Sequence, residues 1–329
     1  LPSGLSLNST TCILSGTPTE GTAMAAYTVT ATNSAGSASG SITIQTLFTT
    51  PKYLYISNNG SDNIYYYLID SLTGILTNTG NVTSGTFTEG IAVDPTGKFL
   101  YATESGSGTV SLHTINQTNG SLSAAISTLS AGSSPKSVAV HHTGKFVYVV
   151  GNNSLVYIYS ADLTSGAITS SGTIATGLNG VWAKIDPYGK FLYIVCQNPT
   201  NLVYSYSIDQ TTGGLTLVNS YAVGTDPRSL EITPDGRFAY IAELNLNRVS
   251  YWSIDTSGNL SSISFSSIGG TAPESVAMDP LGRFAFLGYD NSGNGEIADF
   301  SINSTSGVLT SGTTVPIAAV IPSKMIVDP

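Results

Sequence analysis

Short runs of alternating apolar and polar residues, separated by polar turns, cover most of the chain. In residues 90–129 apolar side chains recur at alternate positions of the runs, as at Phe99 and Tyr101 or at Val110 and Leu112. Alternation with a period of two indicates half-buried β-strands, and no stretch shows the period of an amphipathic helix. Turns that begin with Asn or Asp and end with Gly separate the third and fourth runs. The pattern predicts an all-β protein built from four-stranded units.

One eight-residue motif returns along the chain at an almost constant interval. Its first copy, Asp94–Tyr101, reads D-P-T-G-K-F-L-Y and contains Gly97. The later copies are His141–Tyr148, Asp186–Tyr193, Thr233–Tyr240 and Asp279–Phe286. Their glycines stand at positions 144, 189, 236 and 282, so the steps are 47, 45, 47 and 46 residues. Four strands in each period of this size are typical of a β-propeller blade.

The number of blades follows from counting the third strand of the unit. It is predicted six times, at Asn63–Ile69, Thr109–Ile115, Leu155–Ala161, Leu202–Ile208, Arg248–Ile254 and Glu296–Ile302. We therefore predict six blades, with seven as the alternative if residues 1–50 form a further blade or if chain is missing.

The first unit lacks its first strand, because Lys52–Tyr55 matches the second strand of the other units. The missing element has a counterpart at the opposite terminus, where Ser323–Pro329 matches their first strand. We predict that residues 323–329 pair with residues 52–57 and close a propeller that spans residues 51–329. Closure of this kind removes exposed sheet edges.

Residues 1–50 contain no copy of the motif and are predicted to form a separate β segment with a linker at its end. The stretches L-P-S-G-L-S-L-N-S-T-T-C-I-L-S-G-T-P and Y-T-V-T-A-T-N-S-A-G-S-A-S resemble the Ig-like modules that occur in tandem on bacterial surface proteins. The resemblance implies part of a β-sandwich, with its first half expected upstream of Leu1.

The repeated units themselves resemble a known group of propellers. The D-P-x-G-K/R-F-x-Y motif and the D-x-x-x-G-x-L turns are similar to those of the lactonase-type propellers. That group includes 6-phosphogluconolactonase-like proteins, muconate-lactonising cycloisomerases and the YVTN-like repeat proteins of surface layers. The resemblance covers residues 51–329 and implies the propeller fold, although its well-known enzymes have seven blades. It says less about chemistry, because one fold hosts many functions.

Composition removes several classes of function. The formal net charge is -9 with only 11 Lys and Arg residues, which argues against a nucleic-acid partner. No run of about 18 apolar residues occurs, so no membrane span is expected. The only cysteines, Cys12 and Cys196, are too few for a disulfide framework and lie far from the three histidines in sequence.

Charged residues at one repeat position form the main candidate site. Five residues before the D-P position, where the innermost strand begins, four units carry a charge: Glu89, Lys136, Arg228 and Glu274. Alternate residues of these strands are apolar, so the charges are expected at one end of the central channel. They are catalytic candidates that would bind a carboxylate-bearing ligand or act as acid and base on a lactone. The alternative is a self-neutralising set of charges at a wet channel mouth.

Two other charged residues predict a contact between blades. Lys184 and Glu231 both stand two residues before the D-P position, in consecutive units. We predict that they form a buried ion pair between neighbouring blades, with a structural role.

A weaker candidate is a cation site. Oxygen-bearing residues alternate in the turn at residues 290–296, where they offer the ligands that calcium prefers: Asp290, Ser292, Asn294 and Glu296. The same turn is polar in the other units, so an ordinary polar turn is the alternative. No other cofactor is expected.

The sequence favours two functions from different classes. The first is a secreted or cell-surface structural or binding protein. It would present a propeller face to a protein or glycan partner and assemble with adjacent Ig-like modules or with copies of itself. The modular N-terminus, the low charge and the lack of a nucleophile constellation favour this interpretation, which leans away from an enzyme. The alternative is a lactone hydrolase or lactonising enzyme of the 6-phosphogluconolactonase-like group.

Overall fold

The computed structural model describes residues 1–2, 4–16, 22–34, 36–46, 53–70, 75–177, 179–197, 199–291 and 294–317. Within these ranges the chain is all-β apart from one 3-10 turn, Leu244–Leu246. None of the helices that these residues form is long and apolar enough to cross a membrane. The predicted closing strand at 323–329 lies outside the described residues, so ring closure stays a prediction.

Six antiparallel sheets form the propeller, and each is a blade whose strands follow in chain order. The first three blades comprise β5 (Tyr53–Asn58), β6 (Asn63–Ile69), β7 (Leu76–Thr83); β8 (Thr88–Val93), β9 (Phe99–Glu104), β10 (Thr109–Thr114), β11 (Ser127–Ser130); and β12 (Pro135–Val140), β13 (Phe146–Gly151), β14 (Leu155–Ala161), β15 (Ile168–Ala175). The last three comprise β16 (Gly180–Ile185), β17 (Phe191–Cys196), β18 (Leu202–Ile208), β19 (Leu215–Ala222); β20 (Pro227–Ile232), β21 (Phe238–Glu243), β22 (Arg248–Ile254), β23 (Leu260–Ser267); and β24 (Thr271–Met278), β25 (Phe284–Asn291), β26 (Asn294–Ile302), β27 (Leu309–Ile317).

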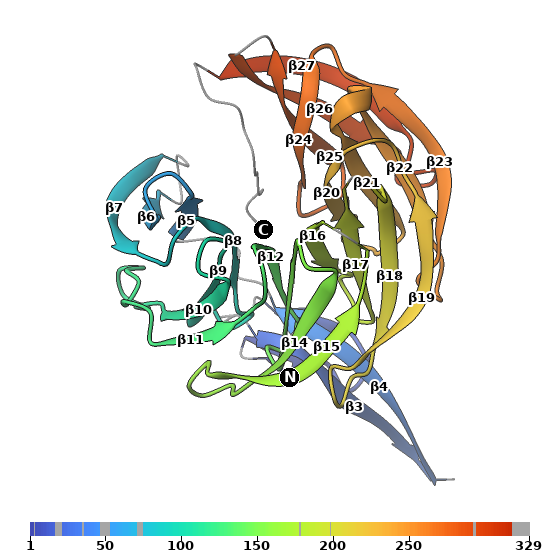
Figure 1. Cartoon of the computed structure of the whole chain (residues 1–329). Coiled ribbons are helices and arrows are strands. Elements are labelled where there is room, and N and C mark those ends of the chain that lie inside the picture. Colours follow the sequence, from blue (N-terminus) through green and yellow to red (C-terminus); the bar gives the residue numbers. More distant parts are fainter. Residues whose placement is uncertain are drawn as a thin grey trace.

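The predicted six-blade propeller is confirmed. Figure 1 shows the blades arranged around a common centre, with the first strands β8, β12, β16, β20 and β24 nearest to it. The third strands β6, β10, β14, β18, β22 and β26 begin and end within two residues of their predicted limits. This agreement arises because period-two alternation and turn residues are local signals.

The second strands carry the core between blades. Every residue of β9, β13 and β21 is buried, because each of these strands is covered by a neighbouring blade on both faces. A strand buried on both faces needs apolar residues on both, which explains near-continuous runs such as F-V-Y-V-V in β13.

The motif tyrosine ties each blade to the next. Five tyrosine hydroxyls donate to the carbonyl oxygen of the glycine that ends the next blade's third turn: Tyr55 to Gly120, Tyr101 to Gly166, Tyr148 to Gly213, Tyr193 to Gly258 and Tyr240 to Gly307. Each glycine has a positive φ and packs against an aromatic ring of the preceding blade, so a side chain there would be strained and would collide.

We expect Tyr148→Phe to lower the free energy of unfolding by about 1–3 kcal/mol, because the buried carbonyl of Gly213 would lose its donor. Urea denaturation measures the change. Tyr188→Phe is the matched control, because the Tyr188 side chain is 49% exposed. This substitution should lower the free energy of unfolding by about 0.5 kcal/mol or less. Equal losses in the two variants would show that the tie between blades contributes nothing.

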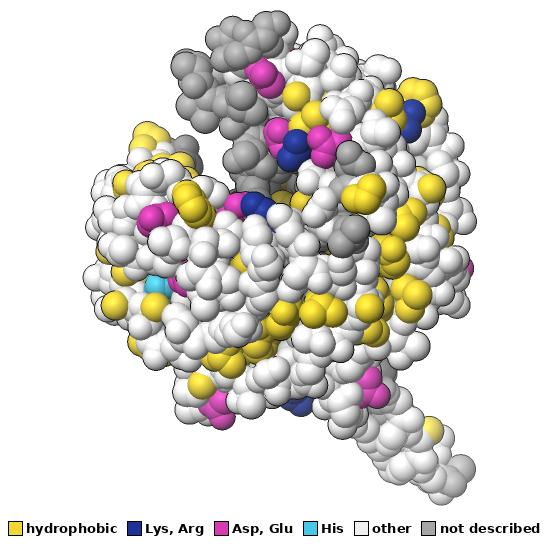
Figure 2. Space-filling model, in the orientation of Figure 1, with side chains coloured by type: hydrophobic (Ala, Val, Ile, Leu, Met, Phe, Trp, Pro, Cys, Tyr) yellow, Lys and Arg dark blue, Asp and Glu magenta, His cyan; other side chains and the backbone are white. Residues whose placement is uncertain are grey.

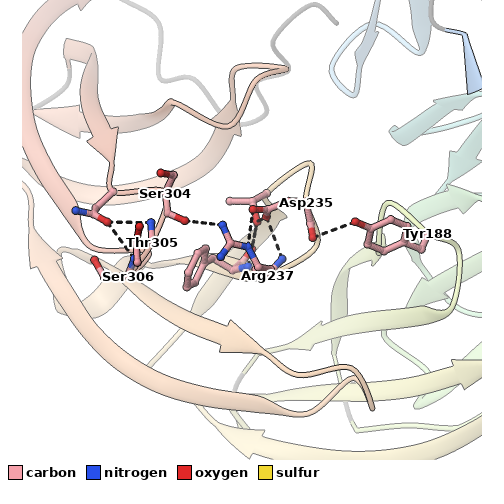
Figure 3. A network of polar contacts seen from close by, with 9 residues as sticks. Tyr188, Asp235, Arg237, Ser304, Thr305 and Ser306 are labelled. Atoms are coloured by element: carbon pink, nitrogen blue, oxygen red, sulfur yellow. Dashed lines mark hydrogen bonds and ion pairs between the residues drawn. The ribbon is translucent and has the colours of Figure 1, made fainter. Parts of the chain in front are cut away.

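A polar network links the last three blades at the end of the inner strands that lies away from the predicted charged positions (Figure 3). Arg237 contacts Asp235 through its Nε at 2.7 Å and donates from its second guanidinium nitrogen to the carbonyl oxygen of Ser304. Tyr188 donates to the carbonyl oxygen of Asp235 at 3.3 Å. These contacts hold the turns of the last three blades together at this end of the propeller.

Residues 1–46 form two hairpins. β1 (Leu5–Leu7) pairs with β2 (Leu14–Gly16), and β3 (Thr22–Asn33) pairs with β4 (Gly36–Thr46). Figure 1 shows the long β3–β4 hairpin extending away from the blades. Two separate hairpins do not establish a sandwich, so the Ig-like assignment stays a prediction.

Candidate functional site

The four charged candidates lie where the sequence places them, at the beginning of inner strands. Glu89 is in β8, Lys136 in β12, Arg228 in β20 and Glu274 in β24. Figure 2 shows acidic and basic side chains close together around the hollow at the centre of this face. Among the described residues they form two ion pairs between neighbouring blades, Glu89 with Lys136 and Arg228 with Glu274.

The first cluster joins the first three blades through side-chain contacts to Glu89. Lys136 forms an ion pair with Glu89. The same carboxylate oxygen of Glu89 accepts hydrogen bonds from the Asn59 amide at 3.0 Å and the Ser105 hydroxyl at 3.2 Å. Three donors on one oxygen fix the position of the Glu89 carboxylate, which suits a structural role at the channel mouth.

The second cluster is built differently. Arg228 lies 3.2 Å from a carboxylate oxygen of Asp226 and 3.7 Å, through its Nε, from Glu274. Burial raises the pKa of the Glu274 carboxyl above its usual value, and Asp226 raises it further, while Arg228 opposes both. A carboxylate with a raised pKa next to a guanidinium combines a proton acceptor with a fixed positive charge.

The predicted ion pair between Lys184 and Glu231 is formed, but it is not buried, because both side chains are partly exposed. The Lys184 ammonium contacts both carboxylate oxygens of Glu231, one of them at 2.9 Å, and joins β16 to β20. Because the Lys184 side chain is 37% exposed, water screens the pair and its contribution to stability is small.

A polar cavity of about 430 Å³ adjoins the second cluster. It lies between the fourth and fifth blades and is lined by Asn179, Gln197, Asn201, Thr225, Asp226 and Asn245. Asp226 belongs to both features, since it lines the cavity and contacts Arg228. The cavity was not predicted from the sequence, although one signal exists. The position seven residues before the D-P residue carries an amide or carboxylate only in the fourth and fifth units, as Asn179 and Asp226.

The calcium candidates are only partly described. Ser292 lies outside the described residues, and the Asn294 side chain is not described. The Glu296 carboxylate accepts hydrogen bonds from the Tyr289 hydroxyl at 2.6 Å and the Asn291 amide at 2.9 Å. In the part of the chain that the structure covers, no three His, Cys, Asp or Glu residues gather as metal ligands. A calcium ion at this turn stays a prediction.

Comparison with known proteins bears on this geometry. A family model described as "Lactonase, 7-bladed beta-propeller" matches residues 7–135, 90–183, 133–231 and 225–325. No curated protein matches the chain.

Three similar solved structures are candidate or named lactonases. A candidate 6-phosphogluconolactonase from Bacteroides uniformis aligns with a TM-score of 0.73 at 15% identity, over 91% of this chain and 98% of its own. One from Bacteroides fragilis gives 0.72 at 14% identity, over 90% and 96%. The periplasmic gluconolactonase PpgL of Pseudomonas aeruginosa gives 0.69 at 18% identity, over 78% of each chain. At these identities the likeness shows the shared fold alone.

Proposed function

This chain belongs to the lactonase family of β-propellers, and from that premise we propose that it is an enzyme that hydrolyses a lactone at the Asp226–Arg228–Glu274 cluster. The observation that carries the proposal is the pairing of a partly buried carboxyl of raised pKa with a guanidinium at the mouth of the channel. The solved lactonase relatives support it only through their fold.

The prediction of a structural or binding protein is wrong. The lactonase model matches segments that together run from residue 7 to residue 325, which favours an enzyme of that family. That interpretation relied on the low charge, the modular N-terminus and the lack of a nucleophile constellation, which are properties read along the chain. They carry no information about side chains that meet only at the channel mouth.

The cluster supports a balanced hydrolytic step. Glu274 accepts a proton from water while the water oxygen bonds to the lactone carbonyl carbon. The carbonyl oxygen becomes an anion that the Arg228 guanidinium stabilises. The bond from the carbonyl carbon to the ring oxygen then breaks, and the ring oxygen takes the proton back from Glu274. One water is consumed, and the product is an open-chain hydroxy acid.

The purified chain should hydrolyse δ-lactones faster than the spontaneous rate, with acid release followed at constant pH. Heat-denatured protein is the control for hydrolysis by exposed side chains. If the native protein hydrolyses hydroxylated and unsubstituted lactones no faster than the heat-denatured protein does, the proposed function is wrong.

Two further assignments remain our proposals. We propose that residues 1–50 are part of an Ig-like module and that the protein acts outside the cell, on the strength of the sequence resemblance. Expression of residues 51–329 alone tests the first, since an independent module can be removed without unfolding the propeller. Fractionation of the source cells tests the second, and purely cytosolic protein would contradict it.

A further inference from the structure

We propose that the cavity between the fourth and fifth blades binds the hydroxyl groups of the substrate, so that the lactone is polyhydroxylated and carries no phosphate. This inference rests on the proposed function, because it places the cavity beside the reacting carbonyl. The volume of about 430 Å³ lies within the range of roughly 300–1,000 Å³ that ligand pockets occupy.

The lining of the cavity is chemically suited to hydroxyl groups. All six lining residues are polar, and four of them carry amides that offer both a donor and an acceptor. An alcohol also donates and accepts, so it matches the mixed donors and acceptors of this lining. The Asn201 oxygen already accepts a hydrogen bond from the Asp226 amide at 3.0 Å, which fixes part of the lining in place.

Gln197 supplies the most specific sign of a ligand. Its Nε2 is buried, yet it has no hydrogen-bond partner within the described part of the chain. A buried donor of this kind needs an acceptor, and a substrate hydroxyl or ring oxygen would provide one.

The internal repeat places Gln197 beside the reacting cluster. The equivalent residue of the first blade, Asn59, donates to Glu89 at the start of the second blade's inner strand. By the same relationship, the repeat predicts that Gln197 of the fourth blade lies near the start of the fifth blade's inner strand, where Arg228 stands. Asp226 lines the cavity with Gln197 and contacts Arg228, which shows that the two features are continuous.

The charges argue against a phosphorylated substrate. A phosphate group would enter a cavity whose one charged lining residue is the acidic Asp226. Within the described ranges, the cations of the two charged clusters are already paired, Arg228 with Asp226 and Lys136 with Glu89. Like charges at short distance repel, so a phosphorylated lactone should bind more weakly than its unphosphorylated counterpart.

The experiment compares three lactones: glucono-δ-lactone, its 6-phosphate and δ-valerolactone, which has no hydroxyl substituents. We test the wild type, Gln197→Leu and the control Asn152→Leu. Leucine occurs naturally at this repeat position as Leu244, so the fold accepts it. Asn152 is the equivalent exposed residue of the third blade and does not line the cavity.

We expect Gln197→Leu to raise the KM for glucono-δ-lactone by about 3- to 10-fold, because one hydrogen bond to the substrate is lost. The KM for δ-valerolactone should not change. Asn152→Leu should change neither, and the 6-phosphate should be the poorer substrate for the wild type. Equal effects of Gln197→Leu on both unphosphorylated lactones, or a preference for the phosphate, would overturn the inference while leaving lactone hydrolysis intact.

If no lactone is hydrolysed, binding of the product analogue gluconate, measured by calorimetry, decides the question separately. Gluconate binding that Gln197→Leu weakens and Asn152→Leu does not would support the cavity as a polyol site. Binding that neither variant alters, or no binding, would overturn it.

Discussion

Glu274→Gln should lower kcat/KM for a δ-lactone by about 10²- to 10⁴-fold, the usual contribution of a general base. Glutamine keeps the size of the side chain and can still contact Arg228, but it cannot accept a proton. The rate of the wild type should also fall as the pH drops through the pKa of Glu274. Because burial raises that pKa, the fall begins at a higher pH than for an ordinary glutamate.

Glu89→Gln is the comparison, and we expect it to change kcat/KM by less than about threefold, well below the effect of losing a general base. Glu89 lies at the same repeat position, but its carboxylate is occupied by Lys136, Asn59 and Ser105. Steady-state kinetics of both variants at several pH values decide the matter. Similar losses in the two, or a Glu274→Gln enzyme of normal rate and pH profile, would show that the base lies elsewhere.

The largest effect on stability is expected from Glu243→Ala, which should lower the free energy of unfolding by about 3–5 kcal/mol. The Glu243 side chain is almost fully buried at the end of β21. It accepts hydrogen bonds from the Gly224 amide at 2.8 Å and the Ser250 hydroxyl at 2.7 Å, and it forms an ion pair with Arg248. Its removal leaves these donors without their acceptor.

Urea denaturation of Glu243→Ala measures this loss, with Asp235→Ala as the control in the same blade. Asp235 pairs with Arg237 on the surface, where the two side chains are 46% and 51% exposed. The Asp235→Ala substitution should therefore lower the free energy of unfolding by about 1 kcal/mol or less. The double variant Glu243→Ala/Arg248→Met should recover part of the stability, because it no longer leaves a cation unpaired. A single variant as stable as the control would contradict this account.

The candidate site was predictable only in part. The repeat identified Glu89, Lys136, Arg228 and Glu274 because they share one position in four units. It gave no reason to separate one pair from the other, since the decisive contacts come from Asn59, Ser105 and Asp226 at other positions. Gln197 was overlooked for a similar reason: an amide in a polar turn becomes informative only once its burial is known.

The sequence by itself determined the all-β architecture, the six repeats and the limits of most strands. Alternation and turn chemistry depend on residues a few positions apart, so they can be read along the chain. Tertiary structure decided which charges meet, that Asp226 joins Arg228 to a polar cavity, and which carboxyl is buried enough to have a raised pKa. Those properties depend on distance and solvent exclusion between residues of neighbouring blades, and only the folded chain sets them.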